Sequence, residues 1–238
     1  MTDHRVELQA AYILHSRPFR ETSLLVDCFS RDFGRVSFVA RGARAARSRW
    51  RCSLQLFRPL LLSWAGRSDL KTLTAAEPSG TLASLTGKAL YCGLYMNELL
   101  MRSLAQQDPH ADLFAVYHAS LLALINGGGL HPPLRQFEIQ LLAAIGLGIQ
   151  LDRDTYSDQP IAADGWYQYK IDQGLVRTGS GGRSGAAVSG KLLKALAAGD
   201  YSNPKHQTGM RLLLQSILKH HLGDKPLASQ ALLRSLEG

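Results

Sequence analysis

The stretch FGRVSFVARGARAARSRWR (Phe33–Arg51) shows how the first part of this chain is organised. Its first half alternates apolar and polar residues and places Val36, Phe38 and Ala40 on one side, which is typical of a β-strand with one buried face. Its second half interleaves arginines with small residues, and so many guanidinium groups cannot be buried without partners. The sequence therefore predicts a strand followed by a basic, flexible surface loop over Gly42–Arg51.

Four other segments near this stretch also have strand patterns. They are residues 6–15, Thr22–Ser30, Leu54–Trp64 and Leu70–Ala75. Arg17-Pro18 is expected to end the first of them. Five short strands in about 75 residues favour a small closed or nearly closed barrel, because closure removes exposed sheet edges. Alternation along the third strand predicts that Arg35 and Arg41 share one exposed face.

After Pro78 the apolar spacing changes from two residues to three or four, which is typical of helices. The predicted helices cover Leu82–Leu104, Asp112–Ile125, Leu134–Leu147, Ser189–Ala198, Pro204–Leu222 and Lys225–Leu236. The sequence thus predicts a multi-domain α+β protein. A five-stranded barrel over residues 1–80 is followed by an all-α domain over residues 81–238, with a short irregular insertion at 148–188.

The charge of the chain is concentrated at its two ends. Residues 1–80 hold 13 Lys and Arg against 7 Asp and Glu, residues 81–190 hold 7 against 9, and residues 191–238 hold 7 against 3. Such asymmetry favours nucleic acid or another anionic surface as partner. The three cysteines are scattered, the N-terminus has no apolar signal region, and no apolar run is long enough to span a membrane. We expect a cytoplasmic protein with no membrane partner.

The arginine-rich segment is the main candidate binding site. Residues 33–68 contain eight arginines, no lysine and no acid, and guanidinium groups suit phosphate by charge and geometry. Trp50 is expected to be exposed and to stack on bases, whereas Phe19 fits stacking and core packing equally well. The residues predicted to bind a nucleic-acid backbone are Arg35, Arg41, Arg44, Arg47, Arg49, Arg51, Arg67 and Lys71.

One motif suggests catalysis. GAAVSGK (Gly185–Lys191) has the spacing of a phosphate-binding P-loop, which would make the protein an ATPase that uses Lys191. However, Leu192 follows where Ser or Thr should bind Mg²⁺, and no apolar strand precedes the motif. A Ser189 N-cap that opens a helix explains the same letters.

The acidic and histidine residues do not make a convincing metal site. Asp152, Asp154 and Asp158 have the spacing of a calcium loop, but Ser157 and Ala163 stand where that loop needs Gly and Glu. The eight histidines are scattered along the chain. We therefore expect no metal, no cofactor and no enzymatic activity.

Several segments closely resemble the RecO family of DNA repair and recombination mediators. They are AYILHSRPFRETSLLVDCFSRDFGRVSFVARGAR, LKTLTAAEP, LYCGLYMNELL and LRQFEIQLLAAIGLG. The resemblance implies an N-terminal OB-fold barrel and a helical C-terminal domain. It also implies binding to single- and double-stranded DNA and annealing of complementary strands. With RecR, and in many bacteria RecF, such proteins help load RecA onto DNA coated by single-stranded-DNA-binding protein.

The resemblance has one departure and one further implication. Some family members carry a four-cysteine zinc module after the helix that matches Leu134–Leu147, but this chain has no cysteine there, so we expect packing through Trp166, Tyr167 and Tyr169 instead. The LRQFE motif implies a site for the C-terminal tail of single-stranded-DNA-binding protein. Its candidate residues are Arg135 for the carboxylate and Leu134 and Leu142 for an apolar pocket. The alternative is that both leucines are core and Arg135 pairs with Glu138.

Three other functions stay open from the sequence. An RNA-binding OB-fold protein would have a similar composition, an ATPase would need Lys191, and a pure adaptor would bind partner proteins without binding DNA. The sequence also leaves open the stoichiometry with RecR and the extent of the DNA path. That path could continue over five basic residues near the C-terminus, namely Lys191, Lys194, Lys205, Arg211 and Lys219.

Overall fold

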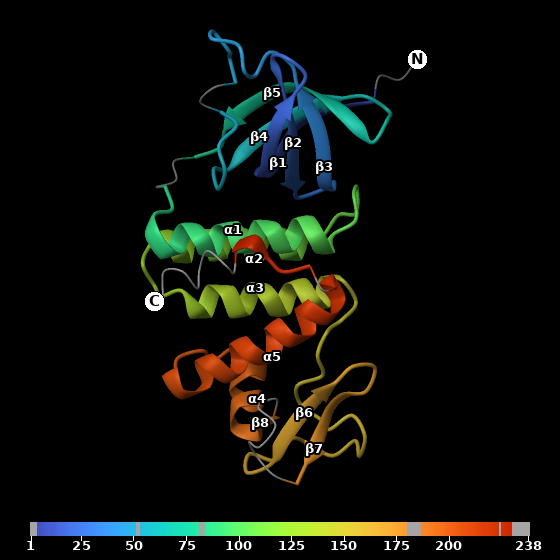
Figure 1. Ribbon diagram of the computed structural model, residues 1–238, viewed down its shortest axis with the longest axis vertical. Helices are drawn as coiled ribbons and strands as arrows, with labels where there is room; N and C mark the ends of the chain where they lie inside the picture. Colours follow the sequence, from blue (N-terminus) through green and yellow to red (C-terminus); the bar gives the residue numbers. More distant parts are fainter. Residues whose placement is uncertain (1–3, 51–52, 81–83, 180–186, 224, 230–238) are drawn as a thin grey trace. The chain divides into compact units, whose positions relative to one another are not determined.

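The computed structural model describes residues 4–50, 53–80, 84–179, 187–223 and 225–229 (Figure 1). Its internal contacts divide the chain into two compact units. The first comprises residues 1–128 together with the segment from Leu227 onward, and the second comprises Gly129–Pro226.

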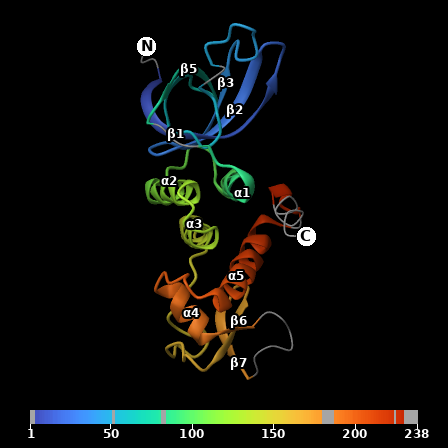
Figure 2. The same ribbon diagram turned by 90° about the vertical axis from the view of Figure 1, so that its left-hand side faces the viewer.

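The first unit begins with a closed five-stranded barrel, seen along its axis in Figure 2. Its strands are β1 (Arg5–Phe19), β2 (Ser23–Ser30), β3 (Gly34–Ala40), β4 (Leu60–Ala65) and β5 (Leu70–Pro78). Their order around the barrel is β1-β2-β3-β5-β4, and β3 runs parallel to β5 while the other pairs are antiparallel. The predicted five-stranded, OB-like barrel is confirmed.

Two strand boundaries differ from the prediction. β1 does not end at Arg17-Pro18 but continues to Phe19, and these residues pair with Leu25 and Leu24 of β2. Proline is tolerated on a strand edge that needs no ladder donor, and β4, the other neighbour of β1, pairs only with residues 5–11. β4 begins at Leu60 rather than at Leu54, so the loop after β3 is longer than predicted.

The barrel interior is filled by apolar side chains from every strand. Ile13, Val26, Phe38 and Leu62 have no exposed surface, and Trp64 is only 2% exposed. These residues follow the period of two expected for one buried strand face. The core therefore fixes which side chains of each strand face solvent.

Two helices pack on the barrel within the same unit, α1 (Gly87–Ser103) and α2 (Ala111–Ile125). The amide of Asn97 donates to the Leu14 carbonyl at 2.9 Å and accepts from the Tyr117 hydroxyl at 2.6 Å. Tyr12 contacts Tyr117 edge to face, and its hydroxyl forms a hydrogen bond with His118 Nδ1. Burial raises the pKa of Tyr117 well above its ordinary value, so this hydroxyl stays protonated and donates. The polar network ties the helices to β1.

The connection after α1 covers part of β3. The Gln107 N–H donates to the Arg35 carbonyl at 2.8 Å, and the Asp108 backbone passes close to Gly34. A Cβ at Gly34 would lie 1.9 Å from the Asp108 oxygen, and the φ of Gly34 is +63°. Both the contact and the backbone conformation require glycine at this turn.

The second unit contains helices and a small sheet. Its elements are α3 (His131–Ala144), β6 (Trp166–Lys170), β7 (Gly174–Thr178), β8 (Ala187–Ser189), α4 (Gly190–Ala197) and α5 (Pro204–Leu222). The strands form an antiparallel sheet in the order β7-β6-β8. The helices lie close to their predicted positions, and Pro132 and Pro133 open α3 as expected.

The prediction of an all-α C-terminal part with an irregular insertion is therefore wrong for the three strands β6, β7 and β8. β6 reads WYQYK, and its short run of aromatic residues pairs with GLVRT through a turn at Asp172 and Gly174, which have positive φ angles. Tyr167 is buried, and its hydroxyl accepts the Ala162 N–H at 2.8 Å. Trp166 is 40% exposed and contributes less packing than expected.

An aspartate orders the loop in front of this sheet. The Asp154 carboxylate accepts backbone N–H groups from Tyr156, Ser157 and Arg177 at 2.7–2.9 Å. Burial acts to raise the pKa of Asp154, but these hydrogen bonds outweigh it and the pKa is lowered. Asp154 acts as a structural anchor between this loop and β7.

The start of the last predicted helix returns to the first unit. The Glu98 carboxylate on α1 accepts the N–H groups of Ala228 and Ser229 and the Ser229 hydroxyl, at 3.0, 2.9 and 2.6 Å. A carboxylate at a helix start satisfies N–H groups that have no partner within the helix. The rest of the predicted helix, to Leu236, lies outside the described residues. Among the described helices, none is long and apolar enough to cross a membrane.

Candidate nucleic-acid interface

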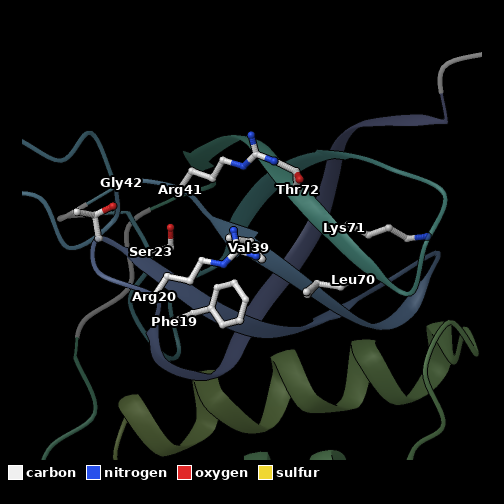
Figure 3. A pocket seen from close by; sticks show the side chains of 10 residues that line it. Phe19, Arg20, Ser23, Val39, Arg41, Gly42, Leu70, Lys71 and Thr72 are labelled. Atoms are coloured by element: carbon white, nitrogen blue, oxygen red, sulfur yellow. The ribbon is translucent and has the colours of Figure 1, made fainter.

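An open groove of about 560 Å³ lies on the barrel between the β1–β2 turn, the end of β3 and the start of β5 (Figure 3). Three of its ten lining residues are cations, namely Arg20, Arg41 and Lys71, and none is acidic. Phe19 adds an aromatic ring. A groove with several cations and a ring is suited to a nucleic-acid backbone with an accessible base.

The β1–β2 turn presents the aromatic part of this groove. Arg20 has a φ of 55°, and its guanidinium carbon lies 5.2 Å from the centroid of the Phe19 ring. Figure 3 shows the two side chains next to each other. Arg20 is exposed and Phe19 is only half-buried, so Phe19 is not committed to the core. The sequence prediction missed Arg20, although its position beside an aromatic residue in a hairpin turn was a usable signal.

The two other cations enter from β3 and β5. Arg41 follows the end of β3, is exposed and extends toward Thr72 (Figure 3). Lys71 pairs with Phe38 across the β3–β5 ladder, is 9% exposed and lines the groove, with its side chain pointing away from Arg41 (Figure 3). The β3–β5 ladder, which pairs Ser37–Val39 with Leu70–Thr72, places both residues in the lining of one groove.

The arginine loop, residues 41–50, is a loop as predicted but is tied to the barrel. The Arg44 N–H donates to the Thr22 carbonyl at 2.8 Å, and its guanidinium reaches the carbonyls of Arg20 and Glu21 at 3.3 Å. Arg44, Arg47 and Arg49 are exposed. The loop therefore places Arg44 beside the β1–β2 turn that forms one side of the groove.

The prediction that Trp50 is exposed is wrong. Trp50 is 5% exposed and packs in the barrel core with residues such as Ala43 and Phe38. Its Nε1–H donates to the Arg41 carbonyl at 3.0 Å, and the Arg49 guanidinium lies 4.2 Å above its ring. Burial of the indole stabilises the fold by more than the ordering of the loop costs. The polarity of the neighbouring arginines did not indicate this outcome.

The structure separates Arg35 from the groove. It is half-buried, and its Nη1–H donates to the Met101 carbonyl in the last turn of α1, where carbonyls lack partners within the helix. Arg35 and Arg41 stand near opposite ends of β3, about 20 Å apart along an extended strand. The expectation that Arg35 is exposed like Arg41 is therefore wrong, because strand alternation predicts the side of the strand but not the helix end that packs there.

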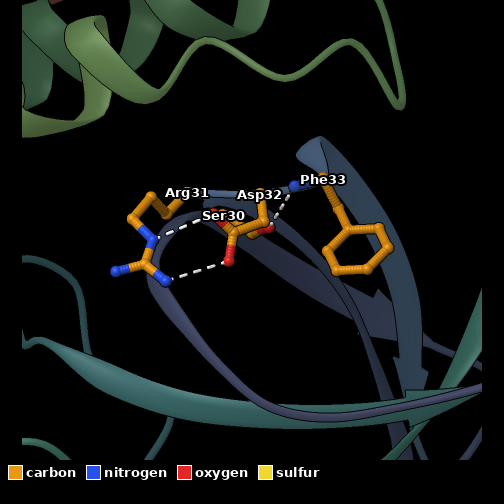
Figure 4. Close-up of polar contacts among 4 residues, drawn as sticks. All are labelled: Ser30, Arg31, Asp32 and Phe33. Atoms are coloured by element: carbon orange, nitrogen blue, oxygen red, sulfur yellow. Dashed lines mark hydrogen bonds and ion pairs between the residues drawn. The ribbon is translucent and has the colours of Figure 1, made fainter.

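The remaining predicted cations have different surroundings. Arg67 is exposed in the β4–β5 turn, and Arg51 lies outside the described residues. Arg31, which is not among the predicted residues, pairs with Asp32 at the β2–β3 turn at 2.9 and 3.1 Å, while the Phe33 N–H donates to Ser30 Oγ (Figure 4). The hydrogen bond from Arg31 lowers the pKa of Asp32, so the carboxylate stays charged and neutralises this arginine.

The residues predicted to bind a protein tail lie on α3 in the second unit. Leu134, Arg135 and Leu142 are 7%, 1% and 0% exposed. Arg135 Nη2 donates to Glu138 Oε1 at 2.7 Å, which is the arrangement of the alternative weighed from the sequence. Within the described residues, Nε and Nη1 of Arg135 have no hydrogen-bond partner.

The start of α4 does not offer a phosphate site of the P-loop kind. Ser189 caps the helix by accepting the Leu192 N–H at 3.3 Å, as predicted. The N–H groups of Gly190 and Lys191 donate to the carbonyls of Gly165 and Ala163 at 2.8 and 3.2 Å. The described backbone donors at this helix start, the N–H groups of Gly190, Lys191 and Leu192, are therefore already used.

Comparison with known proteins matches both parts of the chain to one family. Residues 4–82 match the family model "Recombination protein O N terminal", and residues 84–231 match "Recombination protein O C terminal". The "DNA repair protein RecO" of Nitrosococcus oceani is 47% identical over 232 residues, which cover 98% of this chain and 94% of that protein. Those of Nitrosospira multiformis and Dechloromonas aromatica are 42% and 43% identical, each over 98% of this chain and 97% of the relative.

Proposed function

Because the chain belongs to the RecO family of DNA repair proteins, we propose that it binds single- and double-stranded DNA through the barrel groove and the arginine loop and anneals complementary strands. The observation that carries this proposal is the grouping of Arg20, Arg41 and Lys71 in a groove without acids, bordered by Arg44. Family membership favours DNA as the polyanion, which charge alone does not identify.

The chemistry of the groove favours binding to the backbone rather than to a base sequence. Guanidinium groups neutralise phosphates and release counterions, which gives affinity that depends strongly on salt and little on sequence. The half-buried Phe19 ring offers a stacking surface that is available to an unpaired base. Annealing follows because a cationic surface reduces the repulsion between two strands and raises their local concentration.

We further propose that the protein acts as a non-enzymatic mediator in the bacterial cytoplasm, in association with the nucleoid. In this role it works with RecR, and in some pathways RecF, to load RecA onto DNA coated by single-stranded-DNA-binding protein. The occupied backbone donors at Gly190 and Lys191 favour this mediator role over an ATPase. Loss of hydrolysis in Lys191→Ala would instead support the ATPase.

We also propose that Arg135 receives the C-terminal carboxylate of the single-stranded-DNA-binding protein, with Leu134 and Leu142 beside it. The two guanidinium nitrogens of Arg135 that lack a partner among the described residues support this proposal. A carboxylate there would replace or share the pairing with Glu138. Binding of a fluorescent acidic tail peptide should be lost in Arg135→Ala, and unchanged binding would contradict the assignment.

A single titration tests the DNA proposal. Fluorescent single-stranded DNA is titrated with the protein over a range of salt, and then with unlabelled DNA or RNA of the same sequence as competitor. We expect affinity to fall steeply with salt and DNA to compete at least as well as RNA. Preferential competition by RNA would favour an RNA-binding barrel protein, and no binding at low salt would favour a pure adaptor.

A further inference from the structure

The arginine loop is held by a buried aromatic residue, Trp50, which does not itself line the groove. Trp50 is 5% exposed and belongs to the barrel core, yet it directly follows the exposed Arg49. A buried indole in a strongly basic segment fixes the backbone of that segment to the core. The loop is therefore not a free polycationic tail.

Three contacts connect this indole to the loop. Its Nε1–H donates to the Arg41 carbonyl at 3.0 Å, its backbone N–H donates to Ser48 Oγ at 3.2 Å, and the Arg49 guanidinium lies 4.2 Å above its ring. Arg41 itself lines the groove. Through these contacts the indole joins one groove cation to the loop cations.

A separate set of bonds holds the loop at its other side. The Arg44 N–H donates to the Thr22 carbonyl, and the Arg44 guanidinium reaches the carbonyls of Arg20 and Glu21. The β1–β2 turn and the arginine loop are therefore joined through Arg44. Arginines that are already arranged lose less conformational entropy when they bind phosphates.

We propose that Trp50 is a positioning residue that preorganises the arginine loop for DNA, an inference that rests on the proposed DNA-binding function. The indole does not contact DNA. It keeps Arg41, Arg44 and Arg49 in one arrangement, so that binding does not have to order them. Loosening the anchor lowers the fraction of molecules ready to bind, and the apparent affinity falls by the same factor.

Trp50→Phe is the test variant, because it retains an aromatic ring for the core and for Arg49 but removes the Nε1–H. We expect single-stranded DNA to bind about fivefold more weakly, which corresponds to about 1 kcal/mol for one hydrogen bond. The dependence of affinity on salt should stay as in the wild type, since every arginine is still present to neutralise a phosphate.

Trp64→Phe is the matched control. Trp64 is 2% exposed in the same barrel core, so its replacement makes a comparable void without touching the arginine loop. We expect it to lower the thermal unfolding temperature but to leave DNA affinity within twofold of the wild type.

Three results would overturn the positioning role: Trp50→Phe binding within twofold of wild type, an equal loss in Trp64→Phe, or a salt dependence that weakens along with affinity in Trp50→Phe. Each of these leaves the DNA-binding proposal intact. A wild-type protein that binds no DNA at low salt would refute that proposal as well as the role of Trp50.

Discussion

The most direct consequence of the groove is a defined change in the salt dependence of DNA binding when its arginines are removed. The perturbation is the combined variant Arg20→Ala, Arg41→Ala and Arg44→Ala. All three side chains are exposed and stand at the groove or the adjoining loop. Their replacement should change the free energy of unfolding by only about 1 kcal/mol, because none is part of the core.

The magnitude follows from counterion release. Each phosphate neutralised on single-stranded DNA contributes about 0.7 to the slope of log affinity against log salt. Three lost contacts should therefore reduce the slope by about 2. When salt is raised from 50 to 200 mM, the wild type should therefore lose roughly 20-fold more affinity than the combined variant.

The assay is fluorescence anisotropy with labelled single-stranded DNA at several salt concentrations, accompanied by thermal unfolding to check the fold. Arg31→Ala is the matched control, because Arg31 is an exposed arginine of the same barrel but is neutralised by Asp32. Its slope should equal that of the wild type. If the combined variant keeps the wild-type slope, or if Arg31→Ala lowers it as much, the groove is not the DNA site.

Three further predictions concern stability. Asp154→Ala should lower the free energy of unfolding of the second unit by about 2 kcal/mol or more, because three backbone N–H groups lose their acceptor, and a midpoint of urea unfolding equal to that of the wild type would contradict this. Glu98 has a lowered pKa because, against the effect of burial, hydrogen bonds from Ser229 and its neighbour stabilise the carboxylate. The stability that the Glu98 carboxylate contributes is therefore present above the ordinary glutamate pKa and is lost as pH falls through the lower, folded-state pKa. Amide hydrogen-exchange protection at Ser229 should drop over that pH range in the wild type. In Glu98→Gln it should be weak at every pH. Gly34→Ala should lower the melting temperature well below that of Gly42→Ala, since both have a positive φ but only Gly34 faces the Asp108 carbonyl, and equal melting temperatures would refute the role of that contact.

The sequence by itself determined the barrel, most of the helices and the cationic character of the segment that we propose binds DNA. Period-two alternation around Val36 and Phe38 is a local signal, and so is the exclusion of acids from the arginine-rich segment. The structure agrees with both patterns. Burial of one strand face and solvation of guanidinium groups depend on the residue type at each position, so a local pattern is enough to predict them.

Only the tertiary structure decided which of the basic residues stand together. Arg35 does not line the groove and donates instead to the Met101 carbonyl at the end of α1, and Arg20 lines the groove because the β1–β2 turn meets β3 and β5 there. The β6–β7 pairing in the predicted insertion likewise needed a partner strand, which alternation over five residues does not specify. Trp50 turns inward because the barrel offers an apolar core within its reach. Each of these outcomes depends on contacts between residues distant in sequence, and the energy of such contacts does not appear in any local pattern.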